Sequence, residues 1–146
     1  MSDIRADELP EFRAWSESFE PPADTSAYIA QNVGITAATV LSELFFPQLT
    51  KVRDCVVLAS RYEPSNFDEW WESTAGDRVA IERAINHVHL WDLFEASGEA
   101  EERALEVLAR RVAQAWRCYA EATFADRGFE VTVTDEYGPT VVMNSR

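Results

Sequence analysis

The sequence predicts an α+β domain, in which a small, largely antiparallel sheet is covered by two long helices and several short ones. Three observations lead to this prediction. Helical periodicity fills most of residues 77–125 and is interrupted at Gly98. Residues 129–134 alternate apolar and polar side chains, and after a Tyr-Gly-Pro turn residues 140–143 return as the partner strand of a hairpin. Residues 49–60 hold a β-branched apolar run typical of a buried strand or hairpin.

Length and composition predict a single folded domain. The chain has 146 residues, of which 47% are hydrophobic and 12% aromatic. A chain of this length buries roughly 68–70% of the surface that it exposes when unfolded. High charge combined with low hydrophobicity would predict disorder, but the apolar content of this chain is too high for that.

Residues 1–24 predict an acidic amphipathic helical arm that precedes a single α+β domain of residues 25–146. Apolar side chains recur at three- and four-residue steps from Leu9 to Phe19, Pro10 lies near the helix start, and Asp7 is a candidate N-cap. The pair Pro21-Pro22 ends the arm. Its outer face carries Asp3, Asp7, Glu8, Glu11, Glu17, Glu20 and Asp24.

Two short helices and a β segment follow the arm. We expect Ser26 to cap a helix that reaches Val33, and Thr36 to cap a second one that ends at Phe45, before Pro47. Within residues 49–60 the pair Arg53-Asp54 is a candidate turn that would divide the segment into two strands.

Three helices and a hairpin complete the predicted fold. Ser65 would cap a helix over residues 66–73, Asp77 would open a helix that continues to about Ala96, and the last helix would cover residues 99–125. Its first turn carries three glutamates, which suit the positive end of the helix dipole. Strands over residues 129–134 and 140–143 form the C-terminal hairpin.

The two cysteines and the ends of the chain favour a cytoplasmic protein. Cys55 and Cys118 lie in apolar stretches, where we expect free thiols in the core, although a disulfide between them stays possible on sequence alone. We find no secretory leader and no apolar run of about 20 residues. Lys51 is the only lysine beside twelve arginines, a bias typical of bacteria with GC-rich genomes.

The net charge of the chain limits the classes of molecule that it can bind. The chain carries 26 acidic and 13 basic residues, a net charge of −13, which repels nucleic acids and anionic lipid. It attracts basic proteins over a screening distance of about 8 Å at physiological salt. The sequence holds no phosphate-binding loop, zinc motif or nucleophile motif, so we expect no cofactor and no bound metal.

A cluster of polar groups in the predicted helix 77–96 is a candidate catalytic site. His87 and His89 would point about 200° apart on a helix, so they cannot clasp one metal ion. Glu82, His89 and Asp92 would share an arc of about 80°. We expect a buried network that fixes the register of the two long helices, with an acid–base pair or a metal site as alternatives.

A second candidate site follows the central strand, in residues 67–72. Phe67, Trp70 and Trp71 cannot all be buried from one short helix, so at least one indole should be exposed among carboxylates. The sequence therefore predicts a partner-binding site made of Phe67, Asp68, Glu69, Trp70, Trp71 and Glu72. A core groove that encloses both indoles is the alternative.

Three functions remain open. The first is a module that binds a basic protein partner, for example an inhibitor or immunity protein that neutralises a basic nuclease toxin. The second is a self-associating accessory protein, in which exposed aromatic residues meet across a two-fold axis of a homodimer. The third is a small hydrolase-like enzyme that uses Glu82, His89 and Asp92. Added salt should weaken the first kind of complex and strengthen the second.

Overall fold

The computed structural model describes residues 3–146 and confirms the α+β class. The longer helices in this part of the chain are α1 (Pro10–Glu17), α2 (Thr25–Asn32), α3 (Ile35–Phe45), α4 (Pro64–Ser73), α5 (Arg78–Ile85) and α6 (Glu99–Thr123). The strands are β1 (Leu49–Val52), β2 (Cys55–Leu58), β3 (His87–His89), β4 (Phe129–Asp135) and β5 (Pro139–Ser145).

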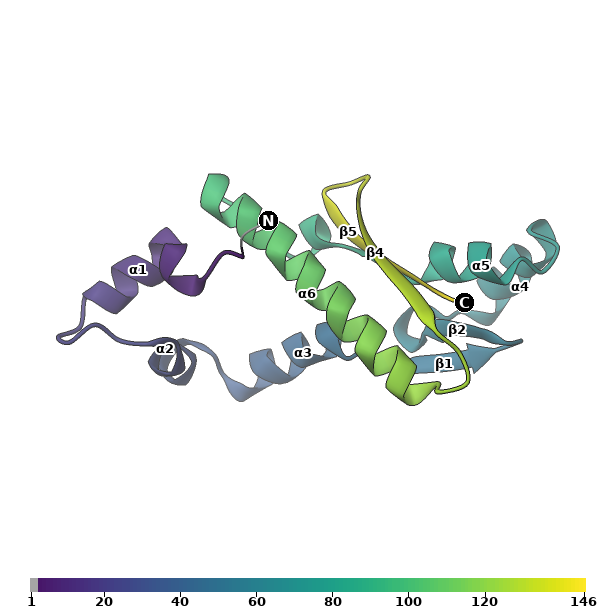
Figure 1. Ribbon diagram of the computed structural model, residues 1–146, viewed down its shortest axis with the longest axis horizontal. Helices are drawn as coiled ribbons and strands as arrows, with labels where there is room; N and C mark the ends of the chain where they lie inside the picture. Colours follow the sequence, from purple (N-terminus) through teal and green to yellow (C-terminus); the bar gives the residue numbers. More distant parts are fainter. Residues whose placement is uncertain (1–2) are drawn as a thin grey trace.

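A three-stranded sheet and the long helix α6 form the main layers of the molecule. The strands are antiparallel in the order β3-β5-β4, and α6 runs diagonally across the sheet (Figure 1). Leu105, Val112 and Trp116 of α6 are buried against Val141 and Met143 of β5. This layer is the larger part of the core.

The second sheet is a two-stranded hairpin of β1 and β2, and the turn predicted at Arg53-Asp54 is confirmed. Both turn residues have positive φ, 46° and 67° respectively. The guanidinium of Arg127, which follows α6, donates to the backbone carbonyl and carboxylate of Asp54 at 2.6 Å each. This pairing lowers the pKa of Asp54 and fixes the hairpin tip to the α6–β4 loop.

One of the two predicted long helices is much shorter than expected. We predicted a helix from Asp77 to about Ala96, but α5 ends at Ile85 and residues 87–89 form β3. The strand pairs with residues 140–142 of β5, and Val88 enters the core. An available strand edge on β5 therefore overrides the helical periodicity of this segment.

Several helix starts and one burial prediction also need correction. Asp24 rather than Ser26 caps α2, with its carboxylate 2.9 Å from the backbone nitrogen of Ala27. The helix α3 begins at Ile35, immediately after Gly34, and no side chain caps it. Cys118 is exposed, whereas we predicted it in the core; Cys118 and the buried Cys55 are both free thiols.

The N-terminal segment lies at the end of the molecule opposite α4 and α5 (Figure 1). Phe12 and Trp15 of α1 pack against Tyr28 of α2, with ring centroids 5.4 Å and 5.0 Å apart. These contacts cross residue 24, where we predicted the arm to end. Ile4 is buried, and Asp3 lies within 4 Å of two arginines of α6.

Candidate partner-binding surface

The helix α4 owes its start to a carboxylate cap. Glu63 accepts hydrogen bonds from the backbone nitrogen of Asn66 at 2.9 Å and from the hydroxyl of Ser65 at 2.6 Å. Pro64 occupies the first helical position, where its missing N–H costs nothing. These hydrogen bonds, led by that from the Ser65 hydroxyl, lower the pKa of Glu63. The cap, Glu63, lies two residues earlier than the predicted Ser65.

Phe67 anchors α4 to the body. Its side chain is 1% exposed and packs in a second core cluster with Cys55, Val57, Ile81 and Ile85. Burial raises the pKa of the neighbouring Cys55 thiol to about 11. Phe67 was predicted to contact a partner directly, but its burial gives it a supporting role beneath the surface.

Trp71 is also held within the protein. Its ring stacks on Phe67 at a centroid distance of 6.2 Å, and the guanidinium of Arg53 lies 5.2 Å from its centroid. Gly76 follows with φ +74°, and a Cβ placed there would come within 3.1 Å of the Trp71 ring. The indole is therefore covered from two sides by residues outside α4.

Trp70 is presented to solvent. The residue is 45% exposed, while the adjacent Trp71 is half-buried and Phe67 is buried. A hollow of about 330 Å³ lies beside it, lined in part by Arg61, Glu63 and Asn66. Of the aromatic residues predicted here, Trp70 is thus the one whose ring offers the largest exposed face.

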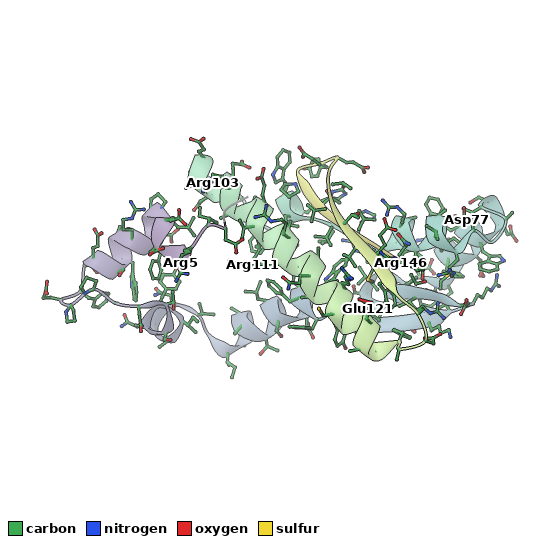
Figure 2. The ribbon with its side chains drawn as sticks, viewed as in Figure 1. Arg5, Asp77, Arg103, Arg111, Glu121 and Arg146 are labelled. Carbon is green, nitrogen blue, oxygen red and sulfur yellow. The ribbon has the colours of Figure 1, made fainter. Side chains whose placement is uncertain are left out.

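Carboxylates flank this indole in the sequence, and Arg61 lines the hollow beside it. Residues 62–77 contain five acidic side chains and no basic one, namely Glu63, Asp68, Glu69, Glu72 and Asp77. Asp68, Glu69 and Glu72 are exposed, and Asp68 pairs with Arg53 at 3.4 Å. Figure 2 shows Asp77 at the α4–α5 end of the molecule, whereas Arg5 and Arg103 lie toward the α1 end. We name Asp68, Glu69, Trp70 and Glu72 the α4 surface.

The three candidate catalytic residues do not form one site. Glu82 is 0% exposed, and its carboxylate accepts from the backbone nitrogens of Val56 at 2.7 Å and Ser145 at 2.9 Å. Arg78 lies 3.6 Å from the same carboxylate. Glu82 therefore sits in a closed, fully hydrogen-bonded setting, with no room for a substrate.

Asn86 completes this network, which joins the two sheets. Its side chain accepts from the backbone nitrogen of Leu58 and donates to the carbonyl oxygen of Val56, both at 2.8 Å. It also donates to the carbonyl oxygen of Met143 on β5 at 3.4 Å. A buried network was predicted, but it connects β2 to β5 through α5 rather than two long helices to each other.

His89 and Asp92 lie apart from Glu82. Because His87 and His89 are on a strand, they share one side of the sheet, with ring centroids 5.1 Å apart, where we predicted opposite directions on a helix. Nδ1 of His89 lies 2.7 Å from Oγ1 of Thr140, and Asp92 is exposed in the turn that follows. Within residues 3–146 no three His, Cys, Asp or Glu side chains gather closely enough to hold a metal ion.

Sequence reasoning missed a second exposed surface, on α3. Ile35, Val40, Leu41 and Phe46 are all exposed there. A signal was present in the sequence, since residues 25–50 contain Glu43 as their one charged residue in a chain with 39. We name Ile35, Val40, Leu41 and Phe46 the α3 surface.

The comparisons with known proteins give no family and no structural neighbour. No protein-family model matches the chain, no curated protein matches it, and no solved structure matches it. In residues 3–146 no helix combines the length and the apolar character needed to cross a membrane.

Proposed function

We propose that the protein is a binding module that recognises a basic protein partner through the α4 surface. One observation carries the proposal: Trp70 is 45% exposed on a helix that Phe67 fixes to the core, and the neighbouring residues Asp68, Glu69 and Glu72 are exposed acids. Exposed aromatic rings on rigid elements are the usual energetic centres of protein interfaces. The surrounding charge selects a cationic partner.

The net charge of the chain, Trp70 and the exposed glutamates of α4 would each contribute to binding in a different way. The net charge of −13 accelerates encounter with a basic protein, and this effect falls as salt rises. Trp70 offers an apolar face for packing and a π-face for an arginine or lysine of the partner. Glu69 and Glu72 are exposed and would pair with cations at the rim.

The same features suit an inhibitor or immunity protein directed at a basic nuclease toxin. Charge complementarity raises association rates in complexes between proteins of opposite charge. We place the protein in the cytoplasm, where the free thiols of Cys55 and Cys118 would persist. Nucleic acid and anionic membranes are repelled by the net charge.

Affinity capture from a lysate of the source organism tests the proposal. Wild type and Trp70→Ala are compared with Trp91→Ala as a matched control, because Trp91 is 48% exposed but lies on the turn after β3. We expect wild type and Trp91→Ala to retain a protein of high isoelectric point. Titration of that purified protein should show Trp70→Ala weakening the complex roughly 30-fold, the effect of losing a central interface residue.

Charge is tested separately with Glu69→Gln/Glu72→Gln. Its control, Glu130→Gln/Glu136→Gln, removes the same charge from exposed residues in and after β4. We expect that of the two double variants only Glu69→Gln/Glu72→Gln associates with the partner more slowly than wild type. We also expect the wild type to bind the partner more weakly as sodium chloride is raised. Equal binding by Trp70→Ala and wild type, or a captured partner that is itself acidic, would refute the proposal.

A further inference from the structure

The helix α3 has a composition that normally belongs inside a protein. Its sequence, ITAATVLSELF, has one charged residue, and seven of its eleven side chains are apolar. A helix of this composition ordinarily buries its apolar residues. Within Ile35–Phe45, however, no residue is buried in the single chain, and Ile35 is 86% and Val40 63% exposed.

The packing and hydrogen-bond contacts that join α3 to the main core lie at its C-terminal end. Leu44 and Phe45 pack against the main core, and the indole nitrogen of Trp116 on α6 donates to the carbonyl oxygen of Leu44 at 2.8 Å. An isolated helix of eleven residues is marginal in water. The first two turns of α3 therefore lack, within one chain, the packing that ordinarily stabilises such a helix.

A groove runs along one side of this helix. It encloses about 950 Å³ between α3 and the segments that follow β2 and β3. Val40 and Leu41 form one wall, and Leu93 and Phe94 form the other. Ile35 and Phe46 are also exposed but do not line the groove, so the apolar area extends beyond it.

We infer that a second copy of this chain covers the α3 surface, so that the protein forms a two-fold homodimer in which the α3 helices pack together. The α3 surface is apolar and almost free of charge, and the surface that complements it best is another of the same kind. Every copy of the chain supplies one. A two-fold interface uses the same patch on both subunits, as this arrangement requires.

Charge explains why this face and not another is suited to self-association. Two copies with a net charge of −13 repel each other, and close contact is least unfavourable where charged groups are fewest. Residues 25–50 carry one charge, and the remaining 120 residues carry 38. Contact through α3 is compatible with an uncovered α4, because α4 lies at one end of the molecule and α3 lies near its middle (Figure 1).

Other occupants fit the α3 surface less well. A small apolar ligand could fill the groove but would leave Ile35 and Phe46 in water. A membrane-surface helix uses basic residues on its polar face, and α3 has none. The basic partner proposed for α4 would find only Glu43 to pair with here.

Light scattering after gel filtration tests the dimer directly. We expect wild type at about 100 µM to elute with twice the mass of the 16.5 kDa chain. Ile35→Glu/Val40→Glu should elute with the mass of one chain, because it would place four carboxylates in the interface. Glutamate at Ile35 lies in the first turn of α3, where negative charge favours the helix, so the variant should stay folded.

A matched control separates the interface from the added charge. Val79→Glu/Val133→Glu adds the same two charges at exposed valines of α5 and β4, and it should remain dimeric. The uncharged variant Ile35→Gln/Val40→Gln should lose the dimer as well. Circular dichroism checks that each variant keeps the wild-type helix content. A monomeric wild type, or a dimer that survives both α3 variants, would overturn the inference.

Discussion

The helices α3 and α4 have nearly the same length, eleven and ten residues, but they expose opposite kinds of surface. The helix α4 is capped by Glu63, fixed by the buried Phe67, and exposes Trp70 together with the acidic residues 68, 69 and 72. The helix α3 follows Gly34 without a side-chain cap, buries no residue within Ile35–Phe45, and has Glu43 as its one charge.

This difference separates two ways in which a helix can be exposed. In α4 the apolar residues are divided, with Phe67 inside and Trp70 outside, so the fold of the single chain is complete and the exposed ring is available. In α3 the apolar residues exceed what the single chain can cover. We therefore propose that α4 binds a partner of opposite charge. We propose that α3 packs against the same uncharged surface of a second copy of the chain.

The largest expected difference between the helices concerns stability. Phe67→Ala should lower the free energy of unfolding by about 3–5 kcal/mol, since it opens a cavity in a fully buried cluster. Val40→Ala on α3 should change it by no more than about 0.5 kcal/mol, since the side chain is exposed. Urea unfolding at a concentration where the chain is monomeric measures both. Equal losses in the two variants would show that α3 is anchored as firmly as α4.

A smaller loss is expected when the support of α4 is weakened indirectly. Glu82→Gln replaces one acceptor with an amide donor that faces the N–H groups of Val56 and Ser145. The unsatisfied groups should cost about 1–3 kcal/mol of unfolding free energy. Glu106→Gln, an exposed change on α6, is the control and should have little effect. A neutral Glu82→Gln would refute the role given to the junction between the sheets.

The smallest expected effect concerns the cap of α4 and depends on pH. Hydrogen bonds lower the folded-state pKa of Glu63, so its contribution to stability is present above its unfolded pKa and is lost as pH falls through the folded value. The gap in urea midpoint between wild type and Glu63→Gln should thus be largest at neutral pH and close under strongly acidic conditions. Glu69→Gln, which removes no cap, is the comparison. A gap that does not change with pH would contradict this account.

Local pattern predicted the elements whose partners are close in sequence. The alternation from Phe129 onward predicted the β4–β5 hairpin, and Arg53-Asp54 predicted the turn between β1 and β2. The end of α5 was not predictable in this way. Ile81, Ile85 and Val88 fit the apolar face of one continuous helix, and only the edge of β5, more than fifty residues later, draws residues 87–89 into a strand.

The candidate sites also depend on contacts between residues that are distant in the sequence, which local pattern does not predict. The sequence predicted that at least one indole of α4 would be exposed, but which one depends on Arg53 and Gly76, which cover Trp71 from outside the helix. The low charge of α3 was visible in the sequence, but sequence alone did not reveal that most of its apolar residues lie outside the core. Tertiary packing decides both outcomes.

Sedimentation velocity of the wild-type chain across a sodium chloride series is the most direct test of the neutral α3 surface. We predict that the dimer fraction rises from 50 to 500 mM salt, because screening weakens the repulsion between two chains of charge −13 while the apolar contact persists. A chain that stays monomeric throughout, or a dimer that dissociates as salt is added, would contradict this prediction.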